Sequence, residues 1–272
     1  MSSPFNAPGA LIELRELEKT YRSHHEGLTR ALERVSFRVD EGEFISIVGP
    51  SGCGKSTLLK ILAGIIPRTG GQVLLRGSSL ESAGANVGLV FQAPVLLPWR
   101  TVLENTLLPA VVLGLDLKKA EARARDLLKM VGLEGFEDSY PSELSGGMQQ
   151  RCAITRGLLH DPPILLMDEP FGALDAMTRE NMNLELQRIW MESAKTILLI
   201  THSIPEAVFL ADRVLVMSAR PGRIIDEVRI PFPRPRSLEL SSTSQFGEFV
   251  MRIRRHFHLS GNVDEAPRQA HG

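Results

Sequence analysis

The residues with the clearest chemical pattern form a glycine-rich loop that leads into a lysine and a serine. The loop comprises Gly49, Pro50, Ser51, Gly52, Cys53, Gly54, Lys55, Ser56 and Thr57. It fits G-x-x-x-x-G-K-[ST] at every fixed position. Glycines permit backbone angles that turn successive N–H groups inward, where they cradle phosphate oxygens. Lys55 would reach the β- and γ-phosphates, Ser56 would hold Mg²⁺, and Thr57 would donate near the α-phosphate. The spacing therefore predicts a nucleotide site.

A pair of carboxylates follows an apolar run further along the chain. Asp168 and Glu169 come directly after Ile164–Met167, which has the length of a buried strand. A carboxylate at such a strand end can hold Mg²⁺ through water. Glu169, one residue further, could orient or deprotonate an attacking water. An ordinary strand end is the alternative, but the glycine-rich loop favours a catalytic interpretation.

Two more polar residues stand at the ends of predicted strands. His202 follows the apolar run 196–201, and Gln92 follows 87–91. Ligands of α/β folds bind outside the carboxyl ends of the strands. We therefore expect His202 to serve the site, with a purely structural histidine as the alternative. The Gln92 amide could bind Mg²⁺ or the attacking water.

A second anion-binding pattern lies at Leu144–Arg151, with the sequence LSGGMQQR. Ser145, Gly146 and Gly147 precede a predicted helix, and a helix N-terminus carries roughly half a positive charge. The segment contains no obvious acid, base or nucleophile. Its form suits phosphate binding, although the chain already has a phosphate loop.

The elements that must position these residues alternate between strands and helices. Strands are predicted near 11–21, 34–39, 43–48, 71–77, 87–92, 164–167, 196–201, 214–218 and 223–230. Helices are predicted near 55–63, 101–114, 117–131, 146–159, 174–192 and 204–211. Short apolar strands that alternate with helices indicate an α/β core with a mostly parallel, buried sheet. The early strands indicate an antiparallel layer, and the helical middle indicates an insertion.

The segment PFPRP at 231–235 should be extended and should mark the end of the core. Beyond it, an apolar stripe at helical spacing comprises Phe246, Phe249, Val250, Ile253 and Phe257. Packing of this stripe on the chain's own core is favoured over an interface with a partner. We expect the last dozen residues to be mobile.

Composition excludes several classes of protein. The chain has 272 residues, 43% of them hydrophobic, and a formal net charge of −1, so no basic field indicates nucleic acid. Two cysteines, Cys53 and Cys152, are too few for a disulfide framework and indicate free thiols. The N-terminus lacks the order of a signal peptide. No apolar run approaches the roughly 20 residues that span a bilayer.

Together these motifs resemble the nucleotide-binding subunits of ATP-binding cassette (ABC) transporters. The resemblance covers roughly Leu11 to Ile230. Its residues, all in the family's order, are Tyr21, GPSGCGKST at 49–57, Gln92, LSGGMQQR at 144–151, ILLMDEP at 164–170, ALD at 173–175 and His202.

The resemblance implies a P-loop NTPase (RecA-like) core of α/β class with an antiparallel β subdomain and an inserted helical subdomain. The expected boundaries are a flexible N-terminus at 1–10, an ATPase domain at 11–236 with its helical subdomain at about 94–160, and a short C-terminal helical extension and tail at 237–272.

The resemblance also assigns roles and partners. It implies that two copies pack head to tail around two ATP molecules, with Mg²⁺. Ser145, Gly146 and Gly147 of one copy then bind the γ-phosphate held by the other copy, and Asp175 communicates across the dimer. Tyr21 stacks on adenine, and Glu169 is the general base. His202 positions the γ-phosphate and water, while Gln92 links Mg²⁺ to the transport partner.

The segment after Gln92, APVLLPWRTVLENTLLP, is similar to the importer branch for nitrate, taurine and alkanesulfonates. That branch implies membrane permease subunits, indirectly a solute-binding protein, and a peripheral place on the cytoplasmic face of the inner membrane. Pro98 and Trp99 could supply a rigid apolar contact to the permease, with local packing as the alternative. An exporter subunit or a soluble, non-transport ABC ATPase remains open. A GTPase is disfavoured because the chain has no N-K-x-D tetrapeptide.

Overall fold

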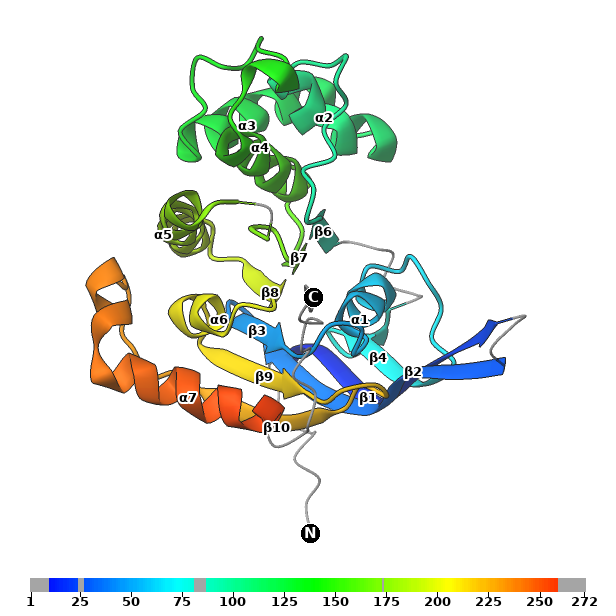
Figure 1. Cartoon of the computed structure of the whole chain (residues 1–272). Helices are drawn as coiled ribbons and strands as arrows, with labels where there is room; N and C mark the ends of the chain where they lie inside the picture. The colour runs from blue at the N-terminus through cyan, green and yellow to red at the C-terminus, as the bar shows by residue number, and fades with distance from the viewer. Residues whose placement is uncertain (1–9, 24–26, 81–86, 173, 259–272) are drawn as a thin grey trace, which may run out of the picture.

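The computed structural model describes residues 10–23, 27–80, 87–172 and 174–258. Within them, two sheets and several helices pack together (Figure 1), and their buried apolar side chains form three clusters. The first sheet has the order β2-β1-β4-β5 and is antiparallel where its strands pair. Its strands are β1 (Ala10–Ser23), β2 (Gly27–Asp40), β4 (Gly70–Leu75) and the short β5 (Ser78–Ser79). The predicted antiparallel layer is therefore confirmed.

The second sheet carries the functional motifs and has the order β10-β9-β3-β8-β7-β6. Its strands are β3 (Phe44–Val48), β6 (Val87–Val90), β7 (Ile164–Asp168), β8 (Thr196–Ile200), β9 (Arg213–Met217) and β10 (Ile224–Arg229). All neighbours pair in parallel except β9 with β10. Strands β3, β7 and β8 therefore end at one edge, where the glycine-rich loop, Glu169 and His202 begin.

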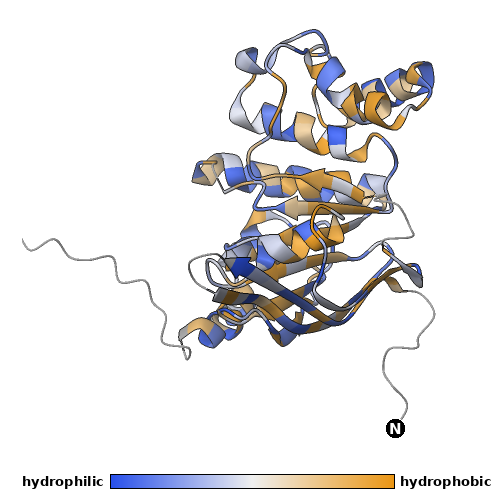
Figure 2. Cartoon of the chain, turned by 90° about the vertical axis from the view of Figure 1, so that its right-hand side faces the viewer, coloured by the Kyte–Doolittle hydropathy of each residue, from blue (hydrophilic) through white to orange (hydrophobic). Residues whose placement is uncertain are grey.

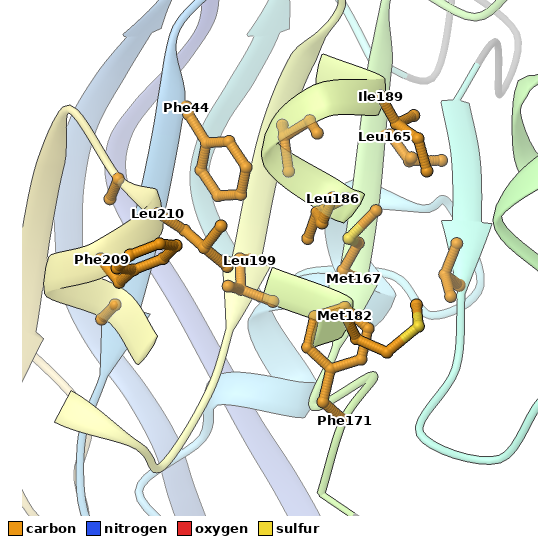
Figure 3. Packing of buried hydrophobic residues seen from close by; sticks show 14 of the residues in the cluster. Phe44, Leu165, Met167, Phe171, Met182, Leu186, Ile189, Leu199, Phe209 and Leu210 are labelled. Atoms are coloured by element: carbon orange, nitrogen blue, oxygen red, sulfur yellow. The ribbon is translucent and has the colours of Figure 1, made fainter. Parts of the chain in front are cut away.

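Both faces of this sheet are buried, which explains its nearly continuous apolar strands. On one face, Ile45 and Ile47 of β3 pack with α1 (Lys55–Leu62) and the antiparallel sheet. On the other face, Phe44 packs with α5 (Ala176–Ser193) and α6 (Ile204–Leu210). Figure 3 shows this second face, where side chains of α5 and α6 meet those of β3, β7 and β8. Hydrophobic residues concentrate along these central strands in Figure 2.

Three helices form a separate group above the sheet in Figure 1. They are α2 (Val102–Leu113), α3 (Leu117–Met130) and α4 (Gly146–Leu158), with a 3-10 turn at Pro141–Glu143. Small side chains let them approach closely, since Ala110, Ala120 and Ala124 are buried together with Leu159. The expected helical middle is present between β6 and β7.

The C-terminal segment departs from the prediction that PFPRP ends the core. Phe232 is buried, and its ring stacks with that of Phe246 at a centroid distance of 6.1 Å. A 3-10 turn at Leu238–Ser242 lies between the two residues in the chain. Helix α7 (Ser244–His258) packs its apolar stripe on the core, as expected, with Ile253 fully buried. The core therefore extends beyond residue 236.

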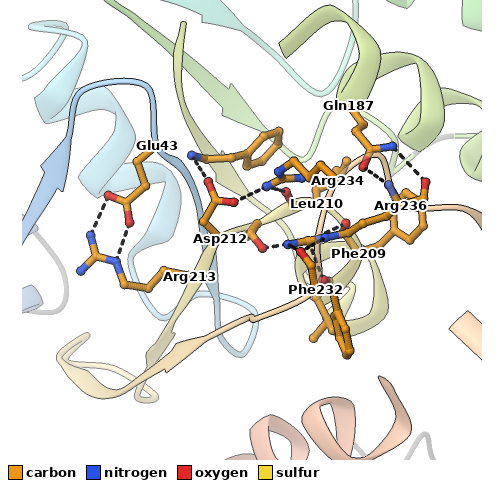
Figure 4. A network of polar contacts seen from close by, with 12 residues as sticks. Glu43, Gln187, Phe209, Leu210, Asp212, Arg213, Phe232, Arg234 and Arg236 are labelled. Carbon is orange, nitrogen blue, oxygen red and sulfur yellow. Dashed lines mark hydrogen bonds and ion pairs between the residues drawn. The ribbon is translucent and has the colours of Figure 1, made fainter. Parts of the chain in front are cut away.

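An arginine explains why the proline-rich segment is buried. Arg236 is only 3% exposed, and its guanidinium donates to the carbonyls of Val208, Phe209 and Ala211 at the end of α6 (Figure 4). These carbonyls have no partner within the helix. Arg234 lies over the Trp190 ring at 4.2 Å, so the segment fastens α6 to α5.

Candidate nucleotide-binding site

The glycine-rich loop connects β3 to α1 at the carboxyl edge of the parallel sheet. Gly54 is the N-cap of α1 with φ 107°, and a Cβ there would lie 2.8 Å from the Ala31 carbonyl oxygen, so only glycine fits. Lys55 is buried, and its ammonium donates to the carbonyl oxygens of Gly49 at 2.8 Å and Pro50 at 3.0 Å. The loop thus curls around its own lysine, as a phosphate cradle does.

A cavity of about 730 Å³ opens over this loop. Its lining includes nine residues that the sequence predicted: Tyr21, Ser51, Gly52, Gly54, Lys55, Ser56, Thr57, Glu169 and His202. The Tyr21 hydroxyl lies 3.3 Å from Thr57 Oγ1, so the aromatic ring stands at the far end of the loop from Gly49. Gly49, Pro50 and buried Cys53 shape the loop but do not line this cavity.

Three lining residues were missed by the sequence analysis: Thr29, Ala31 and Arg220. Thr29 and Ala31 come from β2, and Arg220 comes from the hairpin between β9 and β10. None belongs to a motif with fixed spacing, so pattern recognition had no signal for them.

Two side-chain oxygens that could bind a metal ion, from Ser56 and Asp168, face each other beside the loop. Ser56 Oγ donates to Asp168 Oδ1 at 3.2 Å. Burial is the main cause that raises the pKa of Asp168, and the hydrogen bond from Ser56 opposes it. A partly buried carboxylate next to a hydroxyl at a phosphate loop is a typical donor set for Mg²⁺, which keeps waters and substrate phosphates as its other ligands.

Glu169 and His202 form a contact pair across the ends of β7 and β8. His202 Nδ1 lies 3.0 Å from Glu169 Oε2, and the Glu169 side chain is the less exposed, at 24% against 60%. The Glu169 backbone has φ 47° and its N–H donates to the Ile200 carbonyl at 2.8 Å. This left-handed conformation is costly for a non-glycine residue, and such strain clusters at functional sites. With this backbone conformation, the Glu169 side chain lines the cavity.

Behind this pair lies a buried carboxyl group that the sequence analysis did not single out. Glu206 on α6 is 4% exposed, and no partner is found for its Oε1 among the described residues. Burial raises its pKa to about 7, against an opposing hydrogen bond from Thr201 and the charges of Arg179 and His202. Glu206 therefore lies close to Thr201 and His202, which follow β8.

Gln92 stands at the margin of the site. It follows β6 and is exposed, and it does not line the cavity. A Cβ on Gly172 would lie 3.0 Å from Gln92 Nε2, so the amide packs against the loop that follows Glu169. Gln92 thus contacts the neighbourhood of the carboxylate pair rather than the loop around Lys55.

The serine–glycine segment is not brought to this cavity. Ser145 caps α4, with its Oγ accepting from Met148 N at 3.3 Å, and Ser145 and Gly146 are exposed. Gly147 is buried against α5, where a Cβ would lie 3.5 Å from Thr178 Cγ2. Asp175 caps α5 and is also outside the cavity; the Thr178 hydroxyl lowers the pKa of Asp175. Of the ALD stretch, residue 173 lies outside the described residues.

The phosphate loop lies between the parallel strand β3 and helix α1, and Asp168 and Glu169 stand at the end of β7, which is separated from β3 only by β8. This arrangement defines a P-loop nucleoside triphosphatase. Residues 32–172, just over half of the chain, match the family described as ABC transporter. The chain belongs to that family and is an ABC transporter ATPase, which binds and hydrolyses ATP.

Curated relatives are similar over most of their length. An uncharacterized ABC transporter ATP-binding protein of Methanocaldococcus jannaschii is 52% identical, covering 82% of this chain and 83% of the relative. The taurine import ATP-binding protein TauB of Rhizobium johnstonii is 46% identical over 87% and 92%. The aliphatic sulfonates import ATP-binding protein SsuB of Bacillus cereus is 40% identical over 93% and 98%.

Solved structures support the same fold. The dimeric structure of MJ0796, a bacterial ABC transporter cassette, has a TM-score of 0.70 at 36% identity and covers 82% of this chain and 100% of its own. A dimeric post-hydrolysis state of the same cassette, bound to ADP and Pi, has a TM-score of 0.69 at 35% identity and the same coverage. Among the described residues of the present chain, no helix is both long and apolar enough to cross a membrane.

Proposed function

We propose that this chain is the energising subunit of an importer for a small solute such as taurine or an aliphatic sulfonate. The observation that carries the ATPase part is the convergence of Lys55, Glu169 and His202 on one cavity. The solute class rests on similarity to TauB and SsuB, which cover most of the chain. The cavity itself suits a nucleotide, so the transported solute binds elsewhere in the complex.

The chemistry in the cavity follows from the placement of its side chains. Tyr21 stacks on adenine, and the loop Gly49–Thr57 binds the phosphates. Ser56, Asp168 (through water) and Gln92 would hold Mg²⁺; the facing oxygens of Ser56 and Asp168 support this assignment. When bound, Mg²⁺ neutralises phosphate charge.

Hydrolysis requires a base and a positioned water. Glu169 accepts the proton of the attacking water, and His202 positions the γ-phosphate relative to Glu169. The 3.0 Å contact between His202 Nδ1 and Glu169 Oε2 supports this division of roles. Such a site works mainly by positioning and by stabilising charge.

A second copy of the chain completes each site. Ser145, Gly146 and Gly147 of one copy bind the γ-phosphate held by the other, and Asp175 lies at the contact between copies. The exposure of Ser145 and Gly146, away from their own chain's cavity, supports this arrangement, as do the dimeric cassettes among similar structures. ATP then holds the two copies together, and its hydrolysis lets them separate.

The permease contacts the helical subdomain at about 94–160, which is inserted in an ATPase domain at 11–236. Trp99 is 71% exposed beside exposed Pro98, which argues against local packing of the ring. Asn105 is fully buried and holds this turn, since its amide donates to Leu97, Arg100 and Thr101 carbonyls. A rigid turn that presents an aromatic ring suits docking to a membrane subunit. The chain would then lie at the cytoplasmic face of the inner membrane. A solute-binding protein would act on it only indirectly, and we expect no nucleic acid as a partner.

The test is affinity capture of the full chain from gently solubilised native membranes, followed by mass spectrometry. A polytopic membrane protein in roughly one-to-one ratio is expected, and it should be lost with Trp99→Ala. It should be retained with Leu28→Ala, a truncation of an equally exposed apolar residue on β2, outside the helical subdomain. Transport assays with the captured permease then identify the solute and the direction of transport. Recovery of only soluble or nucleic-acid-bound partners overturns the transporter subunit in favour of a soluble ABC ATPase.

A further inference from the structure

The hairpin between β9 and β10 is seated directly on the glycine-rich loop. Gly222 N donates to the Ala31 carbonyl at 2.9 Å, and the Gly222 carbonyl accepts from Glu33 N at 3.0 Å. A Cβ at Gly222 would lie 2.2 Å from the Cys53 carbonyl oxygen. Only glycine permits this close approach, so the hairpin backbone touches both β2 and the phosphate loop.

The tip of this hairpin is internally fixed. The Ser218 hydroxyl lies 3.0 Å from the carbonyl oxygens of both Ala219 and Pro221, and it accepts from Arg223 N at 3.0 Å. The Arg223 guanidinium also pairs with Glu33 of β2. A tip held at both ends by these contacts presents the side chain of Arg220 from a defined position.

Arg220 extends from this tip into the nucleotide cavity. Its Nε donates to the Gly52 carbonyl at 3.2 Å, and its exposed side chain lines the cavity. Lys55, the other lysine or arginine side chain in the described lining, already donates to the Gly49 and Pro50 carbonyls. Arg220 therefore carries positive charge and further N–H donors that face a space suited to a polyphosphate.

We propose that Arg220 binds the β- and γ-phosphates of the nucleotide from a fixed hairpin beside the phosphate loop. Gly52, to which Arg220 is bonded, lies in the half of the loop before Lys55, whereas Tyr21 contacts Thr57 beyond it. Arg220 is thus at the phosphate end of the cavity. A guanidinium fork matches phosphate oxygens and stays charged at all working pH values. This inference rests on the proposed nucleotide site and adds a residue to it.

The test separates phosphate binding from a purely structural contact with Gly52. Arg220→Gln keeps an N–H donor for the Gly52 carbonyl but removes the charge, and Arg220→Ala removes both. Calorimetric titration of the full chain with ADP, and with ATP in the presence of EDTA, measures the dissociation constants. Both variants should bind ADP and ATP about tenfold or more weakly than wild type. Arg229→Gln, the same charge change at an exposed residue outside this cavity, should bind within about twofold.

The outcomes are distinct. If Arg220→Gln binds like wild type while Arg220→Ala does not, Arg220 only pins the loop and the proposal is overturned. Unchanged binding by both variants overturns it as well. Weakening of ATP binding alone, with ADP binding intact, contradicts a contact with the β-phosphate and overturns the proposal. Failure of the wild-type chain to bind either nucleotide refutes the proposed site as a whole. Circular dichroism verifies that each variant is folded.

Discussion

Glu206 gives the chain a pH-dependent stability that can be measured directly. Burial raises the pKa of this carboxyl group from 4.5 to about 7 in the folded chain. Between pH 4.5 and about pH 7, Glu206 is therefore protonated to a greater extent in the folded state than in the unfolded state. The stability contributed by the neutral group is complete below 4.5 and is lost as pH rises towards 7.

The size of the effect follows from the shift. A shift of about 2.5 pKa units corresponds to about 3 kcal/mol, of which about 2.5 kcal/mol falls between pH 5 and pH 8. Glu206→Gln keeps the shape and removes the ionisation. The variant should therefore gain about 2.5 kcal/mol in free energy of unfolding relative to wild type when the pH is raised from 5 to 8.

Urea denaturation at pH 5, 6, 7 and 8 provides the measurement, with the free energy of unfolding extrapolated to water. Glu248→Gln is the matched control, because Glu248 is exposed on α7 and should follow wild type at every pH. A difference between Glu206→Gln and wild type that stays constant within about 0.5 kcal/mol across this range refutes the reasoning.

Three further predictions concern the nucleotide and the core. Tyr21→Ala should weaken ADP binding by about fivefold or more through lost stacking, whereas Tyr21→Phe should bind nearly as wild type; calorimetry distinguishes them. Arg236→Leu should lower the free energy of unfolding by about 3 kcal/mol, since buried carbonyls lose their donor; equal stability in urea contradicts this. Phe246→Ala should cost about 3 kcal/mol because α7 belongs to the core, and an unchanged denaturation midpoint would refute that.

Much of the architecture could be predicted because local patterns and the fold agree. The apolar runs before Gly49, Asp168 and His202 are strands of one parallel sheet, and parallel strands end at the same edge. That geometry is why three motifs far apart in the sequence meet in one cavity. The contact between Glu169 and His202 also requires that β7 lies beside β8, a strand order that the sequence alone does not reveal.

Other features escaped prediction for physical reasons. Arg236 sits in a proline-rich, charged segment, so composition indicated the end of the core; its burial depends on carbonyls of α6, which the local sequence does not reveal. Arg220 and Ala31 enter the cavity through hairpin and strand contacts with no fixed spacing. The pKa of Glu206 likewise depends on tertiary burial, not on its neighbours in the sequence.

The central claim is that two copies share each ATP, and Glu169→Gln tests it most directly because binding survives while the base is removed. Light scattering coupled to gel filtration should show a dimer with Mg-ATP and a monomer with ADP. Adding Ser145→Glu, which sets a carboxylate against the γ-phosphate held by the other copy, should abolish the dimer without loss of ATP binding. A Glu169→Gln chain that binds Mg-ATP yet stays monomeric contradicts the account.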